Sequence, residues 1–347
     1  MAPSPARTGS TRTRARGTRS TPPAAGAEVL ADLHRRMVRI RRFEEAAGRL
    51  MEAGSIPGFL HLYVGQEAVA AGVIAHLSER DQITSTHRGH GHLVAKGGDL
   101  ARMYAELFGR ATGYCRGKGG SMHVCDLALG MLGANGIVGG GVPIAVGAGF
   151  ADWYRGEGNV SVAFFGDGAS NIGSFHEAAN MAAALKLPVV LVCENNLYGE
   201  FTPQARHQAI RDVAARAGAY GMPGEVVDGM DAVAVWQAAG SAIARARAGE
   251  GPSMLEAKTY RYYDHQGVSG LRISYRSDEE VEEWKARDAI AAIEVRMMEG
   301  GVATREQVEA VHDEIRAEID AAIALAEAAP FPTPDDLLDD VYTEPSR

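Results

Sequence analysis

Two short turns carry residue types that bind anions and metal ions. GDGASN at residues 166–171 follows the apolar run VSVAFF, and NNLYG at 195–199 follows PVVLVCE. Glycine lets backbone N–H groups approach an anion closely, and carboxylate, amide and carbonyl oxygens suit Mg²⁺. If the two turns lie side by side, they predict one site for a diphosphate and its magnesium ion.

The elements around these turns predict that they are neighbours. Short apolar runs at 160–165, 188–194 and 253–262 are typical of buried strands, while 174–187 has the pattern of a helix and 227–251 that of a turn and a helix. This alternation predicts a mostly parallel sheet with helices on both faces, an α/β fold. Loops at the carboxyl edge of such a sheet bind ligands, so both turns should face one crevice.

Three residues of the turns supply oxygens of the required kind. Asp167 offers a carboxylate oxygen, Asn196 an amide oxygen and Tyr198 a main-chain carbonyl. With two phosphate oxygens and one water they would complete the octahedron that Mg²⁺ demands. A helix starting near Ser170 would point its positive end at the same anion. Two unrelated solvent turns are the alternative, but their equivalent placement after apolar runs favours one site.

The remaining segments are predicted from their patterns. Residues 29–52 repeat apolar positions at helical spacing and predict an amphipathic helix, and small residues at 68–77 predict a second helix. Residues 113–149 are rich in glycine, which suggests backbone pressed against a ligand or another subunit. The segments 277–299 and 315–328 predict two charged amphipathic helices.

Composition and charge narrow the class of protein. Residues 1–27 contain five arginines and no acid, and we expect them to form a disordered Arg/Pro/Thr-rich tail, with a transit peptide remaining open. Removing these five charges from the total of −9 leaves −14 for the rest, which argues against nucleic-acid binding. No apolar run is long enough to span a membrane. The spacing of the three cysteines favours reduced thiols and a cytoplasmic location.

The motifs as a set resemble a known family. GDGASN and ENNLYG are similar to the thiamine-diphosphate motif of the alpha subunit of the decarboxylating component of 2-oxo acid dehydrogenase complexes. GFLHLYVGQE, THRGHG, GKGGSMH, GMLGANGIVGGGVP, VDGMD and TYRY match in the same order, over roughly residues 30–340. STHRGHGH and GMLGANGIVGGG most resemble the acetoin dehydrogenase type, and the pyruvate dehydrogenase type comes next.

The resemblance implies a thiamine-diphosphate-binding fold and a division of the chain. Residues 1–27 would be the tail, 28–275 the diphosphate-binding α/β domain with its N-terminal helices, and 276–347 a C-terminal helical extension. The implied cofactors are thiamine diphosphate and Mg²⁺.

The resemblance also assigns roles to individual residues. Asp167, Asn196 and the carbonyl of Tyr198 would bind the metal ion, and the backbone of Gly168 and Ala169 would contact the diphosphate. Four more residues would bind the cofactor: His87 and Arg88 beside the diphosphate, and Gly136 and Val138 at the aminopyrimidine. His61 and His265 would be the catalytic histidines, available for proton transfer near neutral pH.

The other histidines receive no catalytic role. We interpret four of them, in helical or linker contexts, as surface or capping residues: His34, His76, His207 and His312. Three more either line the site or brace its glycine loops, and the sequence leaves both possibilities open: His90, His92 and His123.

The implied activity needs partners. We expect the chain to be too short for a second, pyrimidine-binding domain with its activating glutamate. The resemblance implies that this domain belongs to a beta subunit, in an assembly of two alpha and two beta chains. The enzyme would cleave a carbon–carbon bond next to a carbonyl of acetoin or pyruvate. It would then pass the two-carbon unit to lipoyl on an acyltransferase partner.

Other functions remain as alternatives. The loop at 264–274 departs from the family pattern and places Arg272 where it could bind a phosphate, so a ketose phosphate is another possible two-carbon donor. A non-catalytic scaffolding relative is a further class, which the presence of Asp167, Asn196 and Arg88 disfavours. A nicotinamide dehydrogenase is disfavoured because GDGASN is not GxGxxG.

Overall fold

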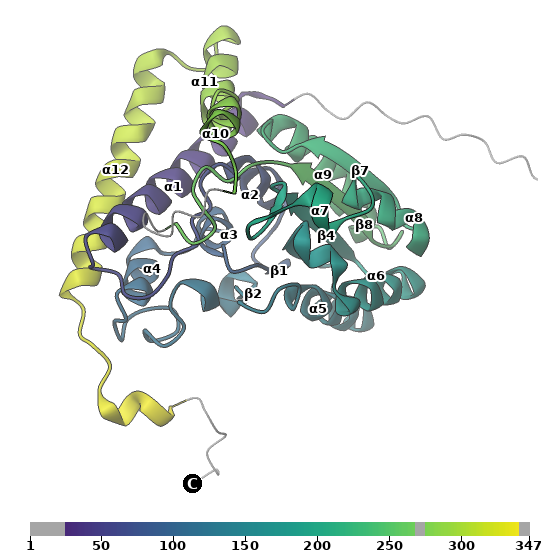
Figure 1. The fold of residues 1–347 in the computed structure, drawn as a ribbon, viewed down its shortest axis with the longest axis horizontal. Helices are drawn as coiled ribbons and strands as arrows, with labels where there is room; N and C mark the ends of the chain where they lie inside the picture. The colour runs from purple at the N-terminus through teal and green to yellow at the C-terminus, as the bar shows by residue number, and fades with distance from the viewer. Residues whose placement is uncertain (1–24, 268–274, 340–347) are drawn as a thin grey trace, which may run out of the picture.

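The computed structural model describes residues 25–267 and 275–339 (Figure 1). The predicted disordered tail falls almost wholly before residue 25. Arg272 and most of the 264–274 loop, like residues 340–347, also lie outside the described residues.

Six parallel strands form the main sheet, in the order β2-β1-β3-β4-β8-β7. They are β1 (Gln82–Thr84), β2 (Met131–Gly133), β3 (Ser161–Gly166), β4 (Val189–Asn195), β7 (Gly224–Asp228) and β8 (Ser253–Lys258). The predicted α/β class is confirmed, and the three long apolar runs are adjacent strands. β1, β2 and β7 were not predicted, because strands of three residues and an exposed edge strand show no apolar run.

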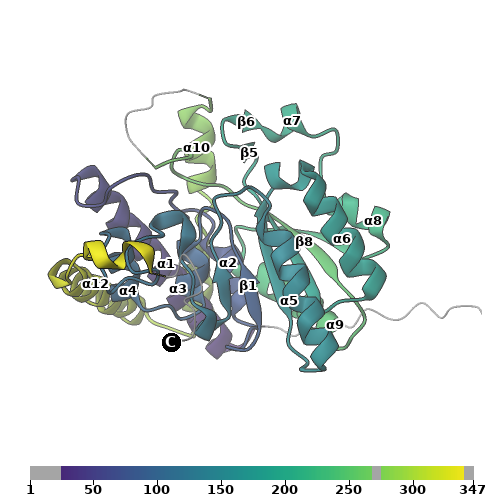
Figure 2. The ribbon, with the colours of Figure 1, turned by 90° about the horizontal axis from the view of Figure 1, so that it is seen from below.

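Helices cover both faces of the sheet (Figure 2). Alternate residues of β3 point to opposite sides, so Phe164 packs with one core cluster and Phe165 with the other. The helices α5 (Gly141–Arg155) and α6 (Gly173–Leu185) cover the face of Phe165, and α2 (Glu67–Ile74) and α9 (Ala232–Arg247) cover that of Phe164. Strands buried on both faces explain the continuous apolar runs.

The register of the central strands places the two turns together. Gly166, the last residue of β3, is paired with Glu194 of β4. Both strands therefore end at the same level, and the turns that begin at Asp167 and Asn196 leave the same edge of the sheet.

The long helices confirm most of the predicted pattern. α1 (Ala27–Glu52) begins within the segment predicted as a tail, and α12 (Arg305–Ala328) packs along α1 and α4 (Leu100–Leu107). In Figure 1, α12 lies beside α1 at the edge of the molecule. The predicted helix at 277–299 is in fact two, α10 (Asp278–Lys285) and α11 (Ala289–Glu299).

Asp288 causes this break, because its carboxylate accepts hydrogen bonds from the N–H groups of Ile290 and Ala291 and so caps a new helix. The remaining short elements are α3 (His90–Ala95), the hairpin β5 (Tyr198–Gly199) and β6 (Thr202–Pro203), α7 (Gln204–His207) and α8 (Ala217–Tyr220). Among the described residues, no helix has the length and apolarity needed to cross a bilayer. All three cysteines are free thiols, as predicted.

One buried carboxylate organises the first part of the glycine-rich segment. Glu106, at the end of α4, is 1% exposed and accepts hydrogen bonds from four backbone N–H groups of the following loop, at 2.7–2.9 Å. The donors are Cys115, Gly117, Gly119 and Gly120. The loop is therefore held by one side chain rather than by regular secondary structure.

We predict that Glu106→Gln destabilises the chain. The amide keeps one acceptor oxygen but turns N–H groups toward two of the backbone donors, and each buried donor left unsatisfied costs about 1–3 kcal/mol. Chemical denaturation should show a loss of about 2–6 kcal/mol in the free energy of unfolding. The exposed Glu309→Gln on α12 is the matched control. Equal stability of the two variants would contradict this role of Glu106.

Candidate functional site

A cavity of about 370 Å³ opens at the carboxyl edge of the sheet, beside the turns that follow β3 and β4. All eleven residues predicted for the site line this cavity: His61, His87, Arg88, Gly136, Val138, Asp167, Gly168, Ala169, Asn196, Tyr198 and His265. The structure thus brings together residues separated by up to 204 positions in sequence. It does not test the role of each residue.

One wall of the cavity, which we call the oxygen wall, is formed by Asp167, Asn196 and Tyr198. The side chains of Asp167 and Asn196 are buried, and both residues line the cavity with Tyr198. The amide nitrogen of Asn196 donates to Oε1 of Gln66 at 2.8 Å, which directs Oδ1 away from Gln66. The neighbouring Asn195 instead bonds to Glu256 in the interior, so only the second asparagine of the pair reaches the cavity.

Two buried arginines give the cavity a positive wall. Arg88 is 3% exposed and donates to the carbonyl oxygens of Leu62 and His265, each at 2.9 Å. Arg261 is 1% exposed and donates to the carbonyl of Glu200 and, at 2.7 Å, to the hydroxyl of Tyr275. No ion pair within the described ranges neutralises either guanidinium. Burial, with the charge of Arg261, lowers the pKa of Arg88 to about 9, so the wall is suited to an anion.

The donor set fits a diphosphate with a divalent cation. Two guanidinium groups are available to the anion, and the backbone at Gly168 and Ala169 lies at the start of the turn that leads into α6. A side chain at position 168 would be sterically restricted, because a Cβ atom there would lie 3.3 Å from Cα of Gly199. The carboxylate and amide oxygens provide the hard ligands that Mg²⁺ requires.

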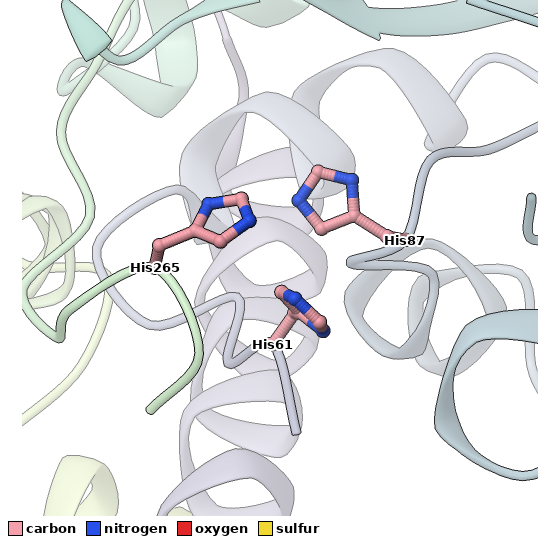
Figure 3. A group of neighbouring side chains, drawn as sticks. All are labelled: His61, His87 and His265. Carbon is pink, nitrogen blue, oxygen red and sulfur yellow. The ribbon is translucent and has the colours of Figure 1, made fainter. Parts of the chain in front are cut away.

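Three histidines of the cavity lie close together (Figure 3). His61, His87 and His265 come from three different loops, and their rings point toward a common centre. The ring of His61 lies 4.7 Å from that of His87 and 4.9 Å from that of His265, between centroids. Nδ1 of His61 and Nε2 of His87 are buried without a described hydrogen-bond partner. The adjacent guanidinium groups disfavour a metal cation among these rings. The unpartnered nitrogens of His61 and His87 are therefore available to a bound molecule, whereas Nδ1 of His265 lies 3.3 Å from Nη2 of Arg88.

These histidines are neutral at physiological pH. Burial, with the charge of Arg88, lowers the pKa of His61 and that of His265 to about 3. The same causes lower the pKa of His87 still further. A neutral imidazole has one N–H group and one nitrogen lone pair, so each ring can donate one hydrogen bond and accept another.

All four histidines that we interpreted as surface or capping residues have tertiary partners, which corrects that interpretation. His207 is only partly exposed, and its Nε2 lies 3.1 Å from Oδ2 of Asp167. His34 is fully buried and, with His312, bonds to Glu294 between α1, α11 and α12. His76 is partly buried, with Nε2 2.8 Å from the carbonyl of Trp236.

The three undecided histidines brace the site instead of lining the cavity. His90 bonds Glu44 and Ser121, and His123 bonds the carbonyl of Gly119. His92 joins Ser85 to Glu194, at the end of β4.

Sequence reasoning also missed Arg261 and Gln66. Arg261 lies in the quoted TYRY motif, where a cation in an apolar strand-like run was a usable signal. Gln66 gave no such signal, because only the fold brings it to Asn196.

The neutral histidines should make the cofactor-free chain sensitive to acid. His61 has an unfolded pKa of about 6.5 and a folded pKa of about 3. Its contribution to stability is therefore complete above pH 6.5 and is lost as the pH falls toward 3. The free energy of unfolding should fall between pH 7 and pH 5, by up to about 1.4 kcal/mol per pH unit for each such histidine.

Urea unfolding at several pH values tests this prediction. His61→Asn should flatten the slope against pH, whatever its effect on stability at pH 7. The exposed His123→Asn serves as the matched control. A slope unchanged by His61→Asn would contradict the burial argument.

Comparison with known proteins places this geometry in a family. Residues 35–335 match the family described as dehydrogenase E1 component. The alpha subunit of acetoin:2,6-dichlorophenolindophenol oxidoreductase from Bacillus subtilis is 50% identical over 311 residues, which cover 89% of this chain and 92% of that protein. The protein of the same name from Cupriavidus necator is 46% identical over 91% of this chain and 94% of its own length.

Pyruvate dehydrogenases are also similar. The alpha subunit of the pyruvate dehydrogenase E1 component from Rhizobium meliloti is 42% identical, over 89% of this chain and 88% of its own length. The family predicted from the motifs is thus confirmed. The chain belongs to the dehydrogenase E1 component family, and this membership implies thiamine diphosphate as its cofactor.

Proposed function

We propose that this chain is the alpha subunit of an acetoin dehydrogenase that binds thiamine diphosphate with Mg²⁺ and acts together with a beta subunit. The observation that carries the proposal is the single cavity that joins an oxygen wall, two unneutralised arginines and three neutral histidines. The relatives named for acetoin, at 50% and 46% identity, support acetoin over pyruvate as the substrate.

The oxygen wall would hold the metal ion and the diphosphate. Asp167 and Asn196 would bind Mg²⁺ through side-chain oxygens and Tyr198 through its carbonyl. Arg88 would bind the diphosphate oxygens, and the backbone N–H groups of Gly168 and Ala169 would add neutral donors. His87, beside Arg88, lines the same cavity and would contact the cofactor.

The aminopyrimidine would lie along the segment that leads into α5. Gly136 and Val138 line the cavity there, and the side chain of Val138 is 57% exposed. An exposed apolar side chain that lines a polar cavity can pack against a flat heterocycle. When bound, thiamine diphosphate would supply a carbon nucleophile for the carbonyl group of the substrate and an acceptor for the electrons of the broken carbon–carbon bond.

The histidines account for the preference for acetoin. Release of acetaldehyde from acetoin requires that the hydroxyl group of the substrate loses its proton. Release of carbon dioxide from pyruvate requires no such step, because the carboxylate is already deprotonated. Nδ1 of His61 is buried without a described partner. It would accept that proton once a bound diphosphate offsets the charge of Arg88, which together with burial lowers the pKa of His61 in the cofactor-free chain. His265, whose ring faces His61 from the opposite loop, would orient the substrate and share the proton.

The beta subunit would complete the site. By resemblance it supplies the pyrimidine-binding domain and the activating glutamate, in an assembly of two alpha and two beta chains, and a lipoyl-bearing acyltransferase accepts the two-carbon unit. Large apolar side chains are exposed beside the cavity and on α5 and α6: Ile137, Val138, Ile144, Phe150, Trp153, Tyr154, Met181 and Leu185. Such a surface is typical of a face that another subunit covers.

We predict that Asp167→Ala abolishes tight cofactor binding. Loss of a direct ligand should weaken the joint binding of Mg²⁺ and thiamine diphosphate by more than the 10- to 100-fold typical of outer-shell partners. Isothermal titration of the alpha–beta assembly measures this affinity. Asp313→Ala, at an exposed position on α12, is the matched control. An affinity unchanged in Asp167→Ala would refute the metal assignment.

The substrate and the split site can be tested in one assay. The chain is mixed with its beta subunit, thiamine diphosphate, Mg²⁺ and a dye acceptor, and acetoin and pyruvate are compared. We expect kcat/KM for acetoin to exceed that for pyruvate by at least about tenfold, the effect of one good hydrogen bond in the site. A preference for pyruvate would refute the substrate. Equal turnover by the isolated chain would refute the shared site.

A further inference from the structure

His207 reaches Asp167 from α7, a helix outside the motifs that point to the cofactor. Nε2 of His207 lies 3.1 Å from Oδ2 of Asp167, and the side chain of His207 is 17% exposed. No described residue hydrogen-bonds the other oxygen, Oδ1. The two oxygens of this carboxylate are therefore not equivalent.

The surrounding contacts determine which nitrogen of His207 carries the proton. Nη2 of Arg216 donates to Oδ1 of Asn171 at 2.7 Å, which fixes the orientation of the amide. Nδ2 of Asn171 then faces Nδ1 of His207 at 3.1 Å and the carbonyl of His207 at 3.2 Å. Because an amide nitrogen only donates, Nδ1 is the acceptor, and a neutral ring carries its hydrogen on Nε2. Nε2–H therefore donates to the carboxylate of Asp167.

The next residue holds the backbone at the same point. Nε2 of Gln208 donates to the carbonyl of Asp167 at 2.7 Å and to Oγ of Ser170 at 3.0 Å. Oγ of Ser170 donates to the same carbonyl at 2.7 Å. Consecutive residues thus fix the side chain and the main chain of Asp167, as expected where a ligand must be held before its ion arrives.

We propose that His207, oriented by Asn171 and Arg216, is a positioning residue for the metal-binding carboxylate of Asp167. The imidazole occupies Oδ2 and leaves Oδ1 for the cation. The inference rests on the magnesium site proposed above and adds to it a segment that the cofactor motif does not contain. Partners of this kind contribute about 10- to 100-fold to metal affinity.

The test measures metal binding directly. Mn²⁺ replaces Mg²⁺ in the alpha–beta assembly with thiamine diphosphate, and electron paramagnetic resonance gives the concentration of free Mn²⁺ during a titration. His207→Ala should weaken Mn²⁺ binding about 10- to 100-fold. His207→Gln retains an N–H donor near the position of Nε2 and should restore most of the affinity. Asn171→Leu, which keeps His207 but removes the donor to Nδ1, should lose roughly 3- to 10-fold, the loss expected for one hydrogen bond.

Two controls separate the possible outcomes. His176→Ala, on α6 and bonded to Tyr220 rather than to the turn, should leave Mn²⁺ affinity unchanged. Wild-type affinity in His207→Ala, or equal losses in His207→Gln and His207→Ala, would overturn the positioning role. If His207→Ala fails to fold, wild-type affinity in Asn171→Leu would overturn it as well. Undiminished Mn²⁺ binding in Asp167→Ala would instead overturn the proposed metal site.

Discussion

The site depends on the register of two neighbouring parallel strands. Because Gly166 of β3 is paired with Glu194 of β4, the loops that follow start at one level and face one crevice. A carboxylate and an amide that are 29 positions apart therefore line the same cavity. A shift of one residue would turn the side chains of β4 to the opposite face, and the two apolar clusters that pack on either side of the sheet oppose such a shift. The core of the protein thus fixes the geometry of the proposed metal site.

The buried positive charges of the cavity have two consequences. Two buried guanidinium groups line the cavity and are suited to bind negative charge. The same positive charges, together with burial, keep three imidazoles neutral. A bound diphosphate would partly neutralise the arginines and raise the pKa values of these rings toward the range where they exchange protons. Cofactor binding and proton transfer would then be coupled through Arg88, which touches His265 directly.

The sequence predicted the parts of this arrangement that local patterns encode. Continuous apolar runs predicted β3, β4 and β8, and the motifs predicted residues that the structure gathers in one cavity. Contacts between distant segments could not be predicted from the sequence. His207 was interpreted as a surface residue, and no local pattern linked Gln66 to Asn196. Strands as short as β1 and β2 carry too few residues for a periodic signal. The break between α10 and α11 had a local cause, since Asp288 caps the second helix, but continuous helical periodicity on both sides concealed it.

The central claim is that one metal ion ties a diphosphate to the ends of β3 and β4. A crystal structure of the alpha–beta assembly with thiamine diphosphate and Mn²⁺, with data collected at the manganese absorption edge, tests it most directly. The account predicts one anomalous peak, bonded to Asp167, Asn196 and the carbonyl of Tyr198, with the diphosphate against Arg88. A bound cofactor whose manganese ion lies away from Asp167 and Asn196 would contradict it.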